Sequence, residues 1–307
     1  MLERHQIAIY FACVAFGAVL GLVLHLPHAL IEPALAVMMF ATFLQVPLLR
    51  PAIGGRFMAA LLMANFVAVP VLVLGLSRFL PDDPLIRLGF YLVLFAPCID
   101  YVITFAQMGR ADSLQLVAAT PVLLALQMLL LPVYLSAAMG PETASIGIAP
   151  FVHAFLWLIV LPLGVAWLVQ SRTGPGIRQR LDLLPVPATG LVLCLVTAAT
   201  MPVLAQAIAA AKTVAPLYLA FAVIAPLIGL AVARGFALPP RQARAVSFSA
   251  ATRNSLVVLP VGLAIPGAMP TVAAVIVTQT LIELISQLIY IRAIPRLIRG
   301  PQQCRAP

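Results

Sequence analysis

The sequence predicts an all-α polytopic membrane protein in which ten transmembrane helices form two inverted five-helix repeats, with the fourth and ninth helices interrupted. Three observations predict this fold. Of the 307 residues, 63% are hydrophobic and only 9% are charged, and the apolar runs reach or approach the roughly 20 residues that span a bilayer as a helix. Basic residues gather on one side of the predicted helices. Polar residues break two long apolar stretches near their middles, about half a chain apart.

The ten predicted spans follow from cutting the apolar windows at charges, prolines and glycines. They cover residues 7–26, 34–49, 57–80, 85–108, 113–138, 151–170, 188–208, 214–233, 243–265 and 271–291. Because the remaining loops are short, we expect a single transmembrane domain over residues 1–307, with repeat one at about 1–140 and repeat two at about 150–300. The first apolar run is longer than that of a typical signal peptide, so we expect it to be retained as the first span.

The distribution of basic residues predicts the orientation of the chain. Of the 18 Arg and Lys residues, fourteen fall in loops on one side of the spans and only Arg78, Arg87 and Lys212 fall on the other, while Arg253 lies within a span. Cytoplasmic loops are enriched in Arg and Lys, so we expect a multi-pass protein of the plasma (inner) membrane with both termini in the cytoplasm. The net charge of +9 is scattered singly, which favours the lipid bilayer and not nucleic acid as a partner.

The two interrupted stretches, Ala96–Asp100 and Ala251–Ser255, occupy corresponding positions in the two halves. Corresponding spans start 154 to 158 residues apart, close to the 153 residues that separate Asp100 from Arg253. Pro97 removes an amide donor from the first stretch, whereas the second break is inferred from its polarity alone. Many secondary transporters build a midplane solute site from paired, interrupted helices of inverted repeats, and we expect such a site here.

Asp100 and Arg253 are the first candidate site residues, because placing each at bilayer depth costs roughly 2.5–3.5 kcal/mol on insertion scales. One explanation is a structural ion pair that satisfies both charges without a ligand. The other is a pair that opens and closes as a substrate or a proton binds. Asn254 and Ser255 follow Arg253 directly and are further candidates for substrate binding.

Glu283, near the centre of the tenth span, is the main candidate for ion coupling, together with Asp100 and with Gln279 one turn before Glu283. A carboxyl group within a span can carry the coupled proton. Alternatively, Glu283 accepts hydrogen bonds from the Arg253 region and braces the ninth span. Cys98 lies beside the first break, where its thiol could face a cavity or simply pack as a small hydrophobe.

Three short motifs resemble those of the bile acid:sodium symporter superfamily, and within it the arsenite-efflux permeases of arsenical resistance. They are Ala96–Val102, Ser249–Pro260 and Leu281–Ile285. The resemblance covers nearly the whole chain in span number and topology, and it implies a functional cysteine at Cys98 and an acidic tenth-span residue at Glu283. The ninth-span glutamates of the two branches fall near Ser249 and Leu256, neither of which is acidic here. The resemblance therefore implies a divergent subgroup without a typical sodium site.

The leading hypothesis is a metalloid exporter that moves arsenite in exchange for protons. Cys98 would make a soft contact with As(III), which is thiophilic, and Glu283 or Asp100 would carry the proton, with sodium as the other possible coupling ion. The alternative is an ion-coupled transporter of bile-acid-like organic anions, in which Arg253 binds the carboxylate. An intramembrane enzyme is not expected, because the acids within spans are only Asp100 and Glu283, on different helices, and no metal-ligand or Ser-His constellation is present. No cofactor is expected.

Overall fold

The computed structural model of the chain describes residues 2–24, 27–44, 53–99, 101–140, 149–172, 181, 184–263, 265 and 270–299. Within these ranges the regular structure is helical, and the single β-type pairing is a bridge between Pro97 and Arg253. The helices are α1 (Leu2–Val23), η1 (His28–Leu30), α2 (Ile31–Leu44), α3 (Gly55–Met63), η2 (Ala64–Ala68), α4 (Val69–Ser77), α5 (Pro84–Leu94), α6 (Tyr101–Met108), α7 (Ser113–Met139), α8 (Ala149–Phe155), η4 (Leu156–Val160), α9 (Leu161–Arg172), α11 (Pro185–Gln206), α12 (Ile208–Gly235), α13 (Pro240–Ala251), α14 (Ser255–Leu263) and α15 (Thr271–Leu297).

Four helical segments in the described part of the chain are long and apolar enough to cross a membrane: Gly55–Ser77, Ser113–Met139, Ile208–Gly235 and Thr271–Leu297. Shorter apolar helices accompany them, at Ala8–Val23, Ile31–Leu44, Pro84–Leu94, Leu156–Arg172 and Pro185–Ala199. All these segments fall within or close to the spans that the sequence predicts. The chain thus has the build of an α-helical membrane protein.

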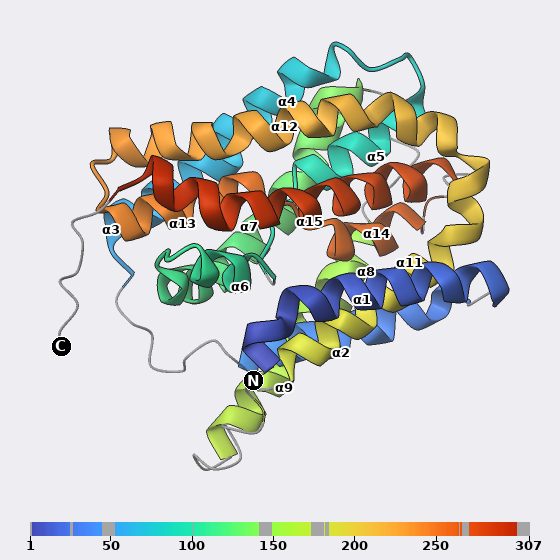
Figure 1. The fold of residues 1–307 in the computed structure, drawn as a ribbon, viewed down its shortest axis with the longest axis horizontal. Helices are drawn as coiled ribbons and strands as arrows, with labels where there is room; N and C mark the ends of the chain where they lie inside the picture. Colours follow the sequence, from blue (N-terminus) through green and yellow to red (C-terminus); the bar gives the residue numbers. More distant parts are fainter. Residues whose placement is uncertain are drawn as a thin grey trace.

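The helices form two groups, which Figure 1 shows on opposite sides of the molecule. In one group α1 packs along α11, and α2 packs against α9 and α11. The close approach of α1 and α11 rests on Gly17 and Gly21, where a Cβ atom would lie 2.4 Å from the carbonyl oxygens of Cys194 and Ala198 respectively. Small residues four apart allow membrane helices to pack backbone to backbone in this way.

The second group contains α12, which packs against α13, α15 and α4, and α5, which packs against α15. Its helices have well-defined starts. Asp83 accepts hydrogen bonds at Oδ1 from the main-chain nitrogens of Leu85 (2.9 Å) and Ile86 (3.1 Å), and Pro84 occupies the first helical position of α5. An Asp cap followed by Pro is a favoured way to begin a helix. This second group holds both interrupted segments.

The predicted interruptions are confirmed. The first lies between the end of α5 at Leu94 and the start of α6 at Tyr101, and the second between the end of α13 at Ala251 and the start of α14 at Ser255. In the first, Pro97 cannot donate to a helical ladder and disfavours helical backbone at the residue before it. The second contains neither Pro nor Gly, yet Thr252 adopts an extended backbone with φ −112° and ψ 131°.

The two breaks, at residues 96–98 and 252–254, pair in antiparallel fashion at the bridge between Pro97 and Arg253; this pair of segments is called the crossing below. The main-chain nitrogen of Cys98 donates to the carbonyl of Thr252 (3.0 Å), and that of Asn254 donates to the carbonyl of Ala96 (2.7 Å). Backbone groups freed from a helix inside a membrane must find partners within the protein. Each break supplies the partners of the other, and this explains why the second one needs no helix-breaking residue.

A hydrogen bond of one half of the chain recurs 156 residues later, and the bridge joins two residues with the same spacing. The hydroxyl of Tyr134 donates to the carbonyl of Phe66, and that of Tyr290 donates to the carbonyl of Ala222, with a separation of 68 residues in both cases. Pro97 and Arg253, which form the bridge at the crossing, have the same spacing of 156. Consequently the two hydrogen bonds of the crossing are counterparts of each other, and the crossing has a local two-fold axis through the bridge.

Candidate functional site

Arg253 is fully buried at the crossing, with an exposed fraction of 0%. Its Nη2 donates to the Oδ1 of Asn65 (2.9 Å) and to the carbonyls of Ser249 (2.7 Å) and Ala250 (2.8 Å), and its Nη1 lies 3.4 Å from the carbonyl of Leu94. The guanidinium carbon also lies 5.6 Å from the centre of the Phe221 ring, a cation–π distance. The buried charge is therefore surrounded by neutral oxygens and one aromatic face.

Two helix ends supply most of these oxygens. Leu94 is the last residue of α5, and Ser249 and Ala250 belong to the last turn of α13. The final carbonyls of a helix lack partners within it and carry partial negative charge. Both helices end at the crossing, so their carboxyl-terminal carbonyls converge on the same guanidinium.

Asn65 is positioned by an irregular turn in its own helix. It lies in η2, a single π-helical turn between α3 and α4, and such turns are frequent at functional sites. The side-chain nitrogen of Asn65 donates to the carbonyl of Leu61 (3.0 Å) and to the hydroxyl of Ser249 (2.9 Å). These two bonds fix the amide so that its oxygen faces Arg253.

Glu283, on α15, is buried beside the same crossing, with an exposed fraction of 3%. Its Oε1 accepts from the hydroxyl of Tyr101 (2.6 Å), and its Oε2 accepts from the main-chain nitrogen of Arg253 (2.7 Å) and the side-chain nitrogen of Gln279 (2.5 Å). Tyr101 begins α6, and Arg253 lies two residues before α14. The carboxylate thus accepts a main-chain N–H just before the start of α14, near the helix end where negative charge is stabilised, and the side-chain hydroxyl of the residue that begins α6.

One face of α15 continues this contact with the second break. Gln279, Glu283 and Gln287 are spaced four residues apart and share that face, and the side-chain nitrogen of Gln287 donates to the hydroxyl of Thr252 (2.7 Å). The hydroxyl of Tyr101 also reaches the carbonyl of Arg253 (3.2 Å). Hydrogen bonds with Tyr101, Glu283 and Gln287 thus fix the second break at Thr252 and Arg253.

Asn254 and Ser255 form the amino-terminal end of α14. The side-chain nitrogen of Asn254 lies 3.4 Å from the Oε1 of Gln127 on α7, and its Oδ1 lies 3.4 Å from the main-chain nitrogen of Val257. Both Asn254 and Ser255 are buried. The structure therefore brings the predicted residues Arg253, Asn254, Ser255, Gln279 and Glu283 together.

Several buried polar atoms of this region make no hydrogen bond within the protein. Among the residues that the structure describes they include Gln127 Nε2, Arg253 Nε, Ser255 Oγ, Gln279 Oε1 and Gln287 Oε1. Buried polar groups in proteins almost always have a partner, either protein or water. Unpartnered donors and acceptors near a break in two helices can bind water or a polar solute.

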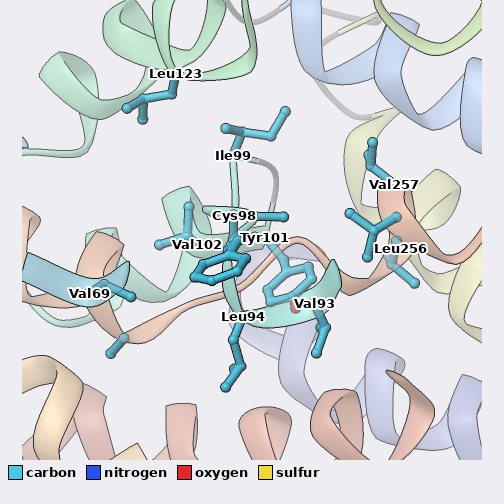
Figure 2. Packing of buried hydrophobic residues seen from close by; sticks show 14 of the residues in the cluster. Val69, Val93, Leu94, Cys98, Ile99, Tyr101, Val102, Leu123, Leu256 and Val257 are labelled. Carbon is cyan, nitrogen blue, oxygen red and sulfur yellow. The ribbon is translucent and has the colours of Figure 1, made fainter. Parts of the chain in front are cut away.

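Cys98 takes part in the crossing through its main chain, while its side chain is buried in a hydrophobic cluster. Figure 2 shows that cluster, with Val93 and Ile99 from the first broken segment and Leu256 and Val257 from the second. The other described cysteines, Cys13 and Cys194, belong to the α1–α11 contact. Cys98 is thus the cysteine that the structure places beside the polar site.

Asp100 lies outside the described residues, so its pairing with Arg253 stays a prediction. Among the residues that the structure does describe, the guanidinium of Arg253 makes no ion pair with a carboxylate. Glu283 instead contacts the main chain of Arg253. The residue opposite Arg253 at the crossing is Pro97 and not Asp100, since hydrogen bonding between the breaks sets their register.

Sequence reasoning assigned no site role to Asn65, Tyr101, Ser249 or Gln287, all of which contact Arg253 or its neighbour Thr252. Gln287 had a usable signal, because it shares the helix face of Gln279 and Glu283. Ser249 and Tyr101 flank the two breaks, which also marks them. Asn65 had no such signal, since a single polar residue in an apolar span commonly just links two helices.

The described residues contain no group of three or more His, Cys, Asp or Glu side chains that could hold a metal ion. In comparisons with known proteins, no family model and no curated protein matches the chain. The buried amides, hydroxyls and carboxylate of the site, next to one thiol, are groups that can bind a polar solute through hydrogen bonds.

Proposed function

We propose that the chain is a secondary-active transporter in which ten transmembrane helices form two inverted five-helix repeats around the crossing. The observation that carries this proposal is the crossing itself, where four half-helix ends meet a buried cation and a buried carboxylate. Discontinuous helices whose ends face a midplane site are the usual construction of secondary transporters. Irregular backbone inside a membrane is tolerated only where it is buried in protein or lines a cavity.

The recurrence of contacts 156 residues apart supports the repeat. It relates Phe66 and Tyr134 to Ala222 and Tyr290, which are linked by the same hydrogen bond. It also relates two helix contacts. A shift of 156 residues makes α9 the counterpart of α1 and α11 the counterpart of α2, so the contact of α1 with α11 corresponds to that of α9 with α2. With the basic loops on one side, the repeat gives a plasma-membrane protein with both termini in the cytoplasm.

We propose a trivalent metalloid, arsenite, as the exported solute and the proton as its counter-ion. Arsenite is mostly the neutral acid As(OH)₃ at neutral pH, so it needs hydrogen-bonding groups and a soft ligand but no buried cation. Cys98 offers the thiol, and Ser255 and Gln127 offer unpartnered polar atoms. The motifs shared with arsenite permeases point the same way, and Glu283 or Asp100 would carry the proton.

The binding of an organic anion by Arg253 is the weaker proposal. Three of the four contacts of its guanidinium are hydrogen bonds of 2.7–2.9 Å from Nη2 to protein oxygens. Only Nε remains unpartnered. A carboxylate would have to displace these bonds before it could pair with the guanidinium.

The test is arsenite accumulation in inverted membrane vesicles from a host that lacks its own exporter, with and without an imposed pH gradient. We expect gradient-driven uptake by the full chain, its loss in Cys98→Ser and its retention in the control Cys13→Ser, because Cys13 lies in the α1–α11 contact. If Cys98→Ser transports arsenite as well as the parent, the thiol has no role. If the vesicles accumulate a labelled carboxylate but no arsenite, and Arg253→Gln abolishes this uptake, the organic-anion alternative holds.

A further inference from the structure

The oxygens around Arg253 form a set that suits a bare monovalent cation. Asn65 Oδ1 and the carbonyls of Ser249 and Ala250 lie 2.7–2.9 Å from one nitrogen, Nη2, and the carbonyl of Leu94 lies 3.4 Å from the other terminal nitrogen. All four are neutral amide or peptide oxygens. Hard cations are bound by such oxygens, and rings of backbone carbonyls replace the hydration shell of K⁺ in channels.

The fold needs a positive charge at this point. The carboxyl-terminal ends of α5 and α13 meet there, inside the protein, and each brings last-turn carbonyls that lack the usual donor four residues on; that of Ser249 accepts a long bond of 3.4 Å from the main-chain nitrogen of Thr252. A buried acceptor left without a donor is destabilising, and the partial negative charges of the two helix ends repel each other. A cation between the two ends removes both penalties.

The side chain of Arg253 supplies that cation, and it does so from a position on the two-fold axis of the crossing. The guanidinium contacts Leu94 and Ala250, which are 156 residues apart, and it also contacts Asn65 and Phe221, which have the same spacing. It therefore touches counterpart positions in both halves. The main chain of Arg253 is held at the same time by Glu283 and Tyr101, so the guanidinium is tethered to the crossing itself.

We propose that this oxygen cage is a monovalent-cation site that is permanently occupied by the guanidinium of Arg253, and that the tethered charge makes the crossing independent of sodium and potassium. Removal of the guanidinium leaves a cage that a small external cation can fill. The proposal does not rest on the transported solute, because its direct consequence is the stability of the crossing.

The experiment measures thermal unfolding of the purified full chain in detergent. The probes are NaCl, KCl and millimolar guanidinium chloride, each compared with choline chloride at equal ionic strength. We expect the unfolding midpoint of the wild-type protein to be the same in all four salts. In Arg253→Ala and in the milder Arg253→Gln, the midpoint in choline is lowered, and it rises with the logarithm of the concentration of at least one small cation, as binding to the folded state requires.

Two further variants separate a cation site from a general loss of packing. Arg253→Lys keeps a tethered charge, so its unfolding midpoint does not depend on the cation. Arg244→Ala is the matched control, since Arg244 also donates to main-chain carbonyls, those of Ile298 and Arg110, but at a partly exposed position. That variant loses stability without any response to the salts.

In the double variant Asn65→Ala/Arg253→Gln, the cation concentration needed to raise the unfolding midpoint is expected to be at least tenfold higher than in Arg253→Gln, because one oxygen of the cage is gone. The proposal is overturned if Arg253→Gln and Arg253→Ala unfold at the same temperature in all four salts. It is equally overturned if the wild-type midpoint depends on sodium or potassium over choline. Both outcomes are independent of whether arsenite is transported.

Discussion

The main-chain nitrogen of Arg253 donates to the carboxylate of Glu283 over 2.7 Å, while the guanidinium of the same residue extends to Asn65, 2.9 Å away, on another helix. Arg253 thus donates its main-chain N–H to the Glu283 carboxylate and places its guanidinium among main-chain carbonyls. The arrangement keeps the two buried charges apart, each among dipoles of suitable sign. Glu283 is consequently available to gain or lose a proton without breaking an ion pair.

The first prediction concerns Glu283→Gln. The amide can replace only part of the carboxylate's role, because its NH₂ group would face one of the donors that now contact Oε1 and Oε2. We expect a loss of about 1–3 kcal/mol in stability, typical of a buried donor left unpaired, and a loss of the response of transport to a pH gradient. Thermal unfolding and vesicle uptake measure the two effects separately.

The control for this substitution is Glu32→Gln, because Glu32 is partly exposed and lies 4.0 Å from the imidazole of His153, where an ion pair is worth little. It should change neither quantity. A Glu283→Gln protein that is less stable but still driven by the gradient would show that Glu283 braces the second break and carries no proton.

The second prediction concerns Tyr101→Phe, which removes one hydroxyl that donates to the Glu283 carboxylate and also lies near the Arg253 carbonyl. A hydrogen bond to a charged group contributes about 1.5–3 kcal/mol. Thermal or denaturant unfolding should show a loss in this range. A loss no larger than that of an ordinary neutral hydrogen bond would mean that Glu283 is protonated in the folded protein at the pH of the measurement.

The third prediction uses the two tyrosines that correspond in the proposed repeat. Tyr134→Phe and Tyr290→Phe each delete a neutral hydrogen bond to a main-chain carbonyl, that of Phe66 or that of Ala222. Each should cost about 0.5–1.5 kcal/mol, and the two losses should be equal within that range. Strongly unequal unfolding midpoints would contradict the view that the two halves use this contact in the same way.

The fourth prediction concerns the packing of α1 on α11. In Gly17→Ala the new Cβ would lie 2.4 Å from the carbonyl oxygen of Cys194, so the helices must separate, at a cost of about 1–3 kcal/mol. Gly164→Ala, in α9, is the matched substitution in open space. It should stabilise the protein by up to about 1 kcal/mol, because Ala favours a helix more than Gly does. Shifts of opposite sign in the two unfolding midpoints, relative to the wild-type protein, would confirm the close contact of α1 with α11.

The positions of the broken helices could be predicted from the sequence because the cause is local. Pro97 and the polar run at Thr252–Ser255 are unfavourable in an apolar helix wherever it packs. The face that α15 turns toward the second break was also readable, since Gln279 and Glu283 are one helical turn apart.

The register of the crossing and the surroundings of Arg253 could not be read in this way. Pro97 lies opposite Arg253 because hydrogen bonds link two segments about 150 residues apart, and no local pattern fixes such a pairing. Asn65 contacts Arg253 from within the π turn at Ala64–Ala68, and nothing in the composition of that stretch marks such a turn. Sequence reasoning therefore found the charged residues but not the neutral oxygens around Arg253, while its pairing of Arg253 with Asp100 stays a prediction.

If the proposed repeat relates the two halves of the chain, the local two-fold axis through the bridge limits how these halves can differ. A guanidinium on the axis occupies a place where only one can fit, so two identical halves, each with an arginine there, would force like charges into contact. The first half instead has Pro97 at the counterpart of Arg253 and Gln127 at the counterpart of Glu283. Joining both halves in one polypeptide permits this asymmetry, in which, among the described residues of the crossing, the second half carries the charged Arg253 and Glu283 and the first half has uncharged residues at their counterparts. A homodimer of half-length chains could not achieve it.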